Sequence, residues 1–187
     1  MKTIYFITSN KGKLKEAKAK LLGVDVDVVQ KNIGYPEIQS NTLEDVAYFG
    51  VNHIQENFNH PFILEDAGLF IDLLDGFPGV YSAYVLHTLG CNGILKLLDG
   101  VDTNKRKAYF KSVFAYGVPG KKPKFFIGKC NGRISNREQG DHGFGYDPIF
   151  IPNCNTRTFA QMDTEEKNLF SHRGKSLEKL MEFFKKL

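Results

Sequence analysis

Apolar runs and amphipathic runs alternate from the start of the chain. Ile4 to Thr8 has the character of a buried strand, and Lys11 to Leu22 follows with apolar residues at helical spacing. Val24 to Val29 then alternates like a second strand. This order of strand, helix and strand is typical of layered α/β proteins, in which helices cover a sheet.

The centre of the chain predicts a helix followed by a short strand with an acidic end. From Thr42 to Asn57 the apolar residues lie on one side of a helix, and Asn41 precedes them as a candidate N-cap. Phe62 to Leu64 is a short apolar run that ends in Glu65-Asp66. Gly76 to Gly79, which includes a proline, predicts a turn.

The second half of the chain predicts a strand pair between helices. Ala108 to Tyr116 and Phe125 to Ile134 have the aromatic and β-branched content of strands. Ile94 to Leu98 favours a helix, Thr164 begins a short one, and Ser176 to Leu187 closes the chain as an amphipathic helix.

Length, charge and cysteine usage narrow the class of protein. The 187 residues suit one domain, with a second and mostly β lobe over roughly residues 105–150. Three widely spaced cysteines indicate reduced thiols and a cytoplasmic location. No apolar stretch approaches the roughly 20 residues of a membrane helix. A net charge of +4 suits a polyanionic small molecule, and we expect neither nucleic acid nor membrane as a partner.

The segment from Thr8 to Lys13 stands where a predicted strand passes into a predicted helix. Backbone amides, the helix N-terminus and the Lys13 ammonium could converge there on a phosphate. The glycine spacing differs from that of a Walker A loop. On this motif alone, an ordinary capped turn with surface lysines is an equally good interpretation.

Glu65 and Asp66 place two carboxylates at a predicted strand end, where open α/β sheets bind ligands. Carboxylate oxygens suit Mg²⁺, which keeps several waters and bridges to substrate phosphates. Glu44 lies three residues after Asn41, so it either completes a capping box or supplies a third metal ligand. A simple acidic turn is the alternative interpretation of the pair.

A glycine-rich loop from Gly140 to Pro148 carries two aromatic residues and an acid. Aromatic faces on such a loop can stack on a nucleobase. We take Phe144, Tyr146 and Asp147 as candidate substrate-binding residues, although Tyr146 is the better candidate for a structural role. A tight turn with Phe144 in the core is the alternative.

Hydrogen-bond donors gather at Lys167, His172 and Arg173, in a predicted break between two helices. His172 and Arg173 could donate to the 6-keto oxygen of a purine. A solvated surface pair is the alternative interpretation when these residues are considered alone.

Taken together, these motifs resemble one family along essentially the whole chain, the inosine triphosphate pyrophosphatases, also called Ham1-like non-canonical purine nucleoside triphosphate pyrophosphatases. Five collinear motifs carry the resemblance. They are Thr-x-Asn-x-x-Lys at 8–13, the acidic-acidic-x-Gly-Leu run at 65–69, Gly-Phe-Pro-Gly-Val-Tyr-Ser at 76–82, Gly-Phe-Gly-Tyr-Asp-Pro at 143–148, and Glu166-Lys167 followed by Ser171-His172-Arg173.

The resemblance implies an α/β fold: an elongated mixed sheet flanked by helices, in two lobes with a nucleotide cleft between them. It implies a homodimer that hydrolyses dITP, ITP and XTP to the monophosphate and pyrophosphate with Mg²⁺ or Mn²⁺. The implied roles are these: Asn10 and Lys13, in one motif with Thr8, hold the triphosphate; Glu44 and Asp66 hold the metal, Glu65 being a less certain ligand; Asp66 is the general base; Phe144 stacks on the base; and Lys167, His172 and Arg173 contact the nucleotide.

Three positions depart from the family pattern. Many members have a phosphate-binding lysine after the helix glutamate, and here Glu44 is followed by Asp45-Val46-Ala47-Tyr48-Phe49. The usual Asp-Asp pair is Glu65-Asp66, and the usual serine is Ala67. Phosphate neutralisation must therefore depend more on Lys13, the metal and helix termini.

Two other functions fit parts of the sequence. A Maf-like pyrophosphatase would act on canonical or modified pyrimidine triphosphates, but the Ser171-His172-Arg173 element argues against it. A nucleic-acid or nucleotide-binding module without catalysis would suit the basic balance. It leaves Glu44, Glu65 and Asp66 without a purpose, because carboxylates repel phosphates unless a cation intervenes.

Overall fold

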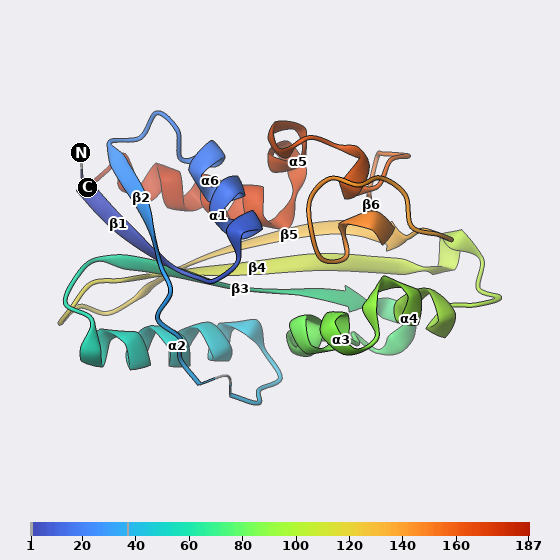
Figure 1. The fold of residues 1–187 in the computed structure, drawn as a ribbon, viewed down its shortest axis with the longest axis horizontal. Helices are drawn as coiled ribbons and strands as arrows, with labels where there is room; N and C mark the ends of the chain where they lie inside the picture. Colours follow the sequence, from blue (N-terminus) through green and yellow to red (C-terminus); the bar gives the residue numbers. More distant parts are fainter. Residues whose placement is uncertain (1, 37) are drawn as a thin grey trace.

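The computed structural model describes residues 2–36 and 38–187, and the strands within them form one six-stranded mixed sheet (Figure 1). The strands are β1 (Lys2–Ile7), β2 (Val26–Lys31), β3 (Phe62–Ile71), β4 (Lys107–Gly117), β5 (Lys124–Ile134) and β6 (Phe150–Pro152). Their order is β2-β1-β3-β4-β5-β6. β1 pairs parallel with β2 and β3, and β4 to β6 continue the sheet antiparallel, which confirms the predicted mixed sheet.

Helices cover both faces of this sheet. They are α1 (Lys11–Lys20), α2 (Leu43–Asn57), α3 (Ser82–Thr88), α4 (Gly90–Leu97), α5 (Thr164–Phe170) and α6 (His172–Phe184). Because side chains alternate along a strand, Val113 and Ala115 of β4 pack with α2, whereas Phe114 packs with α1 and α6 on the opposite face. None of the helices in the described residues is long and apolar enough to cross a membrane.

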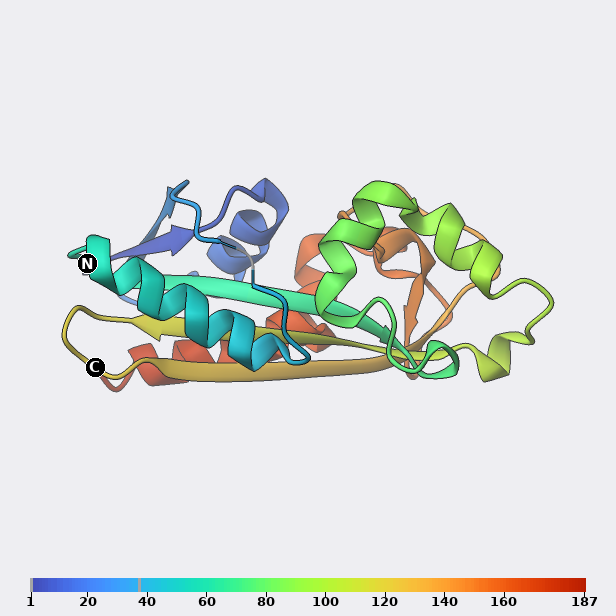
Figure 2. The same cartoon turned by 90° about the horizontal axis from the view of Figure 1, so that it is seen from below.

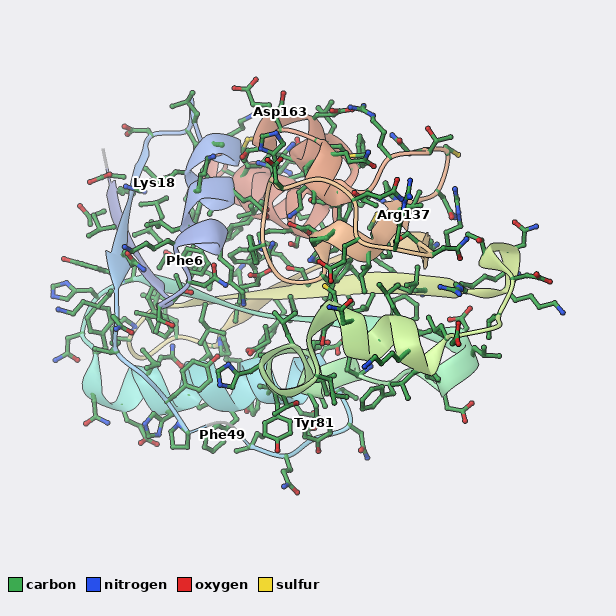
Figure 3. The ribbon with its side chains drawn as sticks, turned by 45° about the vertical axis from the view of Figure 1, so that its right-hand side comes forward. Phe6, Lys18, Phe49, Tyr81, Arg137 and Asp163 are labelled. Atoms are coloured by element: carbon green, nitrogen blue, oxygen red, sulfur yellow. The ribbon has the colours of Figure 1, made fainter. Side chains whose placement is uncertain are left out.

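Two groups of elements lie at opposite ends of the long strands β3 and β4 (Figures 1 and 2). One end carries β1, β2, α1 and α2, and its core includes the buried Phe6 (Figure 3). The other end carries α3, α4 and β6, with a core that includes Leu69, Ile94 and Phe150. The long strands therefore connect two packed halves, and the interval between the halves lies along the middle of β3.

Where β1 ends, none of the six strands in the described residues continues the pairing along that edge of β3. β1 pairs with β3 only as far as Leu64, which is opposite Ile7, while β3 continues to Ile71. Beyond that point, side chains from the two halves bond the β3 backbone. The Nζ of Lys13 donates to the carbonyl of Glu65 at 2.9 Å, and the Oγ of Ser82 accepts from the amide of Leu69 at 2.8 Å.

Several predicted boundaries are corrected by the structure. The acidic pair lies inside a continuous strand, because the pairing of β3 with β4 runs unbroken through Asp66 opposite Val113. The N-cap of α2 is Thr42 rather than Asn41, and its Oγ1 accepts from the amide of Asp45 at 3.2 Å. Helix α3 was not predicted.

The last helix also begins earlier than predicted. α6 starts at His172 instead of Ser176, because the side chain of Ser171 caps the amide of Gly174 at 3.0 Å. The chain at His172 lies directly against β5, where a Cβ on Gly128 would come within 2.0 Å of the His172 carbonyl oxygen. His172 and Arg173 are therefore rigid first-turn residues of a helix and not part of a loop.

Candidate active site

The two neighbouring acids of β3 point to opposite faces of the sheet. The Glu65 side chain is buried on the α6 face, where the Oγ of Ser112 donates to it at 2.7 Å. Asp66 faces the α2 side, where the hydroxyl of Tyr35 donates to its Oδ2 at 3.2 Å and its Oδ1 at 3.4 Å. The alternation of a strand thus gives the two carboxylates different surroundings and different uses.

Two adjoining cavities open where β1 leaves the edge of β3. The first has a volume of about 130 Å³, and its lining includes Phe110, Phe144, His172 and Arg173. The second has a volume of about 300 Å³, and its lining includes Asp66. Lys13, Ala67 and Ala83 line both cavities, so the two form neighbouring parts of one site.

The turn before α1 positions Lys13 between the two cavities. The Oγ1 of Thr8 accepts from the amide of Asn10 at 3.1 Å, and the Oδ1 of Asn10 accepts from the amide of Lys13 at 3.0 Å. Asn10 lines the first cavity, whereas Thr8 lines neither. Thr8 therefore supports the turn, and Asn10 and Lys13 are the members of this motif that a ligand can reach.

A buried network of charges supports the first cavity. The Nε of Arg173 donates to both carboxylate oxygens of Glu65, at 2.8 and 2.9 Å, and its Nη1 donates to Glu16 at 2.7 Å. The Nζ of Lys167 donates to Glu16 at 2.7 Å and to Asp147 at 2.6 Å. These five side chains come from α1, β3, the glycine-rich loop, α5 and α6, so the network ties the two halves together.

Two acids of the network, Glu65 and Glu16, are kept ionised by their cationic partners. Burial would raise the pKa of Glu65, but the charges of Arg173 and Lys13 and the hydrogen bonds to the carboxylate lower the pKa to about 2. Burial likewise opposes ionisation of Glu16, and the charges of Arg173 and Lys167 bring its pKa below the usual value. Glu65 is therefore a partner of cations within the protein, and this geometry argues against it as a metal ligand.

Phe144 and its loop close one side of the first cavity. The ring lies against Gly12, where a Cβ would approach within 2.4 Å of it. The Lys167 ammonium and the Arg173 guanidinium lie 4.9 and 5.2 Å from its centroid, at cation–π distance. The amide of Phe144 donates to Asp147 at 2.8 Å, which fixes the loop.

The polar groups of three predicted substrate-binding residues already bond other groups of the protein. Tyr146 is buried and its hydroxyl donates to the carbonyl of Ser82 at 2.9 Å. Asp147 and Lys167 form the buried ion pair described above. Tyr146 and Asp147 line the first cavity, but their polar groups act as supports, and Lys167 does not line it.

His172 forms the floor of the first cavity together with Phe110. The two rings stack with centroids 4.5 Å apart and an angle of 13° between their planes. Burial, and then the charges of Arg173 and Lys167, lower the pKa of His172 well below its usual value, so the imidazole is neutral. Its Nδ1 is buried without a hydrogen-bond partner in the described residues. A ligand group with one donor or acceptor can pair with this ring.

The predicted metal ligands are not brought into one cluster. No group of three or more His, Cys, Asp or Glu side chains that could hold a metal ion occurs in the described residues. Glu44 pairs with Lys111 of β4, and its Oε2 is buried without a partner among those residues. Asp66 alone of the three predicted ligands lines a cavity, and this arrangement fits Mg²⁺ only with substrate phosphates and water completing its shell.

Some site residues carry no signal that the sequence interpretation used. Glu16 is the single acid of the lysine-rich helix α1, and nothing else in the sequence distinguishes it. Tyr35 lies in a segment between predicted elements, next to a proline, and Ser112 lies within the predicted strand Ala108 to Tyr116. Their roles depend on partners far along the chain, since Ser112 bonds a residue 47 positions away.

Comparison with known proteins shows the family of this chain. A sequence model of the Ham1 family matches residues 4–183. A dITP/XTP pyrophosphatase of Pyrococcus horikoshii is 52% identical over 97% of this chain and 96% of that protein. A dITP/XTP pyrophosphatase of Thermococcus kodakarensis is 49% identical over 96% of each chain.

Solved structures show the same fold. A HAM1 protein from Coxiella burnetii superposes with a TM-score of 0.86 at 28% identity and covers 100% of both chains. The Staphylococcus aureus Ham1 protein gives a TM-score of 0.83 at 29% identity over 98% of both chains. The sheet and its flanking helices are those of a Ham1-type fold. This chain belongs to the Ham1 family.

Proposed function

We propose that this protein hydrolyses the non-canonical purine nucleoside triphosphates dITP, ITP and XTP to the monophosphate and pyrophosphate. The observation that carries the proposal is the pair of cavities joined at Lys13, one with an aromatic wall and polar groups, the other with Asp66. Such a site can take a base on one side and phosphates on the other. The names of the relatives, dITP/XTP pyrophosphatases, support the same activity.

The first cavity has the chemistry to accept a purine with an oxygen at position 6. Phe144 offers an aromatic wall, and a neutral His172 and Arg173 offer polar groups beside it. The rigidity of the network around Arg173 keeps these groups in place before the ligand arrives. An adenine amino group would oppose the donors, at a cost of about 1–3 kcal/mol for each unsatisfied group.

Asp66 is the proposed general base. Its carboxylate lies on the wall of the second cavity, where it can orient a water molecule and take its proton as the water attacks the α/β phosphoanhydride. Lys13, whose Nζ is held at the carbonyl of Glu65, neutralises part of the phosphate charge. No other basic residue lines the second cavity within the described part of the chain.

Asp66 would also hold magnesium together with the substrate phosphates, and Mn²⁺ is an acceptable substitute. When bound, the metal supplies positive charge that stabilises the developing phosphate charge. Glu44 stays a predicted second ligand, since its unpartnered oxygen can accept a cation but its other oxygen is paired with Lys111.

We also propose a homodimer located in the cytoplasm. Exposed aromatic residues support the dimer, and Tyr81, directly before α3, is one that Figure 3 shows at the surface. Three free cysteines support a reducing compartment. Light scattering of the purified protein tests the dimer.

The decisive experiment measures pyrophosphate release from ITP, XTP, dITP, GTP, ATP and dUTP, with and without Mg²⁺. We expect metal-dependent release that is fastest with ITP, XTP and dITP and slow with ATP. A preference for pyrimidine triphosphates would favour a Maf-like activity. Binding of DNA without release from any triphosphate would favour a module without catalysis.

A matched pair of variants tests the role of Asp66. Asp66→Asn should lower kcat by about 10²–10⁴-fold because the general base is lost while the strand remains. Asp72→Asn changes an exposed acid just after the same strand and should keep the wild-type rate. Near-normal pyrophosphate release by Asp66→Asn would show that Asp66 is not the general base.

A further inference from the structure

The candidate general base is held by a tyrosine from the chain segment between β2 and α2. The hydroxyl of Tyr35 donates towards both oxygens of Asp66, at 3.2 and 3.4 Å. The same segment supplies Ile38 and Gln39 to the wall of the second cavity. Tyr35 therefore joins the wall of that cavity to the strand that carries Asp66.

The ring of Tyr35 packs against α2 at a position where only glycine leaves room for it. A Cβ on Gly50 would lie 2.8 Å from two ring atoms of Tyr35, closer than real Cβ contacts allow. The ring also packs at the edge of the core cluster that contains Leu64 and Val113. The position of the hydroxyl is thus set by the backbone of a 15-residue helix and by the sheet.

We propose that Tyr35 is a positioning residue that fixes the carboxylate plane of Asp66 for metal binding and proton transfer; this rests on the proposed function. A carboxylate rotates about its last bond, and a donor that reaches both oxygens restricts the rotation. Hydrogen-bonded partners of metal-binding carboxylates typically contribute about 10–100-fold in metal affinity or activity. Tyr35 donates this bond from outside the reacting atoms.

Tyr35→Phe is the first test, because it removes the hydroxyl and keeps the ring on Gly50. We expect kcat for ITP to fall by about 10–100-fold, with KM and the thermal unfolding temperature close to wild type. Mn²⁺ binding, measured by electron paramagnetic resonance with a non-hydrolysable ITP analogue, should weaken in the same variant. A raised KM with wild-type kcat and Mn²⁺ binding would show that Tyr35 only holds the segment that carries Ile38 and Gln39, and would overturn the proposal.

Gly50→Ala tests the same contact from the opposite side. The added methyl group displaces the Tyr35 ring, so we expect kcat to fall in this variant. We expect a similar fall in Tyr35→Ala, which removes the ring. In the Tyr35→Ala background the ring is gone, and Gly50→Ala should then have no further effect on kcat. If the double variant loses more kcat than Tyr35→Ala alone, Gly50 acts independently of Tyr35. This result would contradict the proposed contact between the two residues.

Tyr48→Phe is the matched control. Tyr48 lies on α2, as Gly50 does, and is 55% exposed, so loss of its hydroxyl should change neither kcat nor Mn²⁺ binding. The two proposals fail in different ways. If the wild-type protein releases pyrophosphate from no triphosphate, the proposed function is wrong; if it is active and Tyr35→Phe matches it in kcat and Mn²⁺ binding, the role of Tyr35 is wrong.

Discussion

Arg173 of α6 binds Glu65 of β3 through its Nε, which lies 2.8 and 2.9 Å from the two carboxylate oxygens, and both side chains are buried. The contact joins residues 108 positions apart in the chain. It fixes the first turn of α6 to the middle of the sheet. Since His172 precedes Arg173, the same contact sets the floor of the first cavity.

Glu65→Gln should therefore destabilise the fold strongly. The substitution keeps the size of the side chain but leaves the Arg173 guanidinium with less buried negative charge, and breaking a buried pair typically costs about 3–5 kcal/mol. Chemical denaturation gives the free energy of unfolding. Glu182→Gln, at an exposed position of α6, is the control and should change it little. Equal stability of the two variants would contradict the role assigned to the Glu65 pair.

The same carboxylate predicts how stability depends on pH. The pKa of Glu65 is lowered from 4.5 to about 2 in the folded protein. Its contribution is therefore complete above the unfolded pKa and is lost as pH falls through that value towards the folded one. The free energy of unfolding should decrease between about pH 5 and 2, and less steeply in Glu65→Gln than in wild type. Parallel curves would show that Glu65 is not responsible.

The strands and most helices could be predicted because their side chains follow the period of the element. β4 and β5 carry the alternating apolar residues of strands that pack on both faces. Helix α3 escaped prediction because Ser82–Thr88 is short and has no side-chain N-cap. The acidic pair looked like a strand end because charges are rare inside a buried strand unless a partner is present.

The candidate site was predictable in its residue types and not in their contacts. Lys13, Phe144, His172 and Arg173, which come from three separate motifs, line the first cavity together. The ion pair between Lys167 and Glu16 could not be inferred, because the two residues are 151 positions apart and no local pattern in the sequence marks the pair. The sequence shows which groups can react, and only the fold shows which are already engaged.

Lys13→Met should weaken substrate binding more than it changes the fold. Lys13 lines both cavities and is the basic residue in the lining of the cavity that contains Asp66, so its removal should raise KM for ITP. We expect a rise of at least about 10-fold, which corresponds to about 1.4 kcal/mol of lost binding. Steady-state kinetics measure it, with the exposed Lys15→Met as the control for loss of a charge on α1. An unchanged KM would remove Lys13 from the phosphate site.

His172→Phe should reduce discrimination between purines. Phenylalanine can keep the stack on Phe110, whose centroid is 4.5 Å from the imidazole, but it offers no nitrogen to the base. We expect the ratio of kcat/KM for ITP to that for ATP to fall by roughly 10-fold or more, since one unsatisfied group is worth about 1–3 kcal/mol. The exposed His87→Phe is the control and should keep the wild-type ratio.

The pH dependence of this ratio separates the neutral imidazole from a charged one. Because burial and the charge of Arg173 hold the pKa of His172 well below 6.5, the ring stays neutral near neutral pH. The ITP to ATP ratio of the wild-type protein should therefore be constant between about pH 6 and 8, where an ordinary histidine titrates. A ratio that falls as pH rises through this range would mean that His172 reads the base as a cation, and the surroundings described for it would then be wrong.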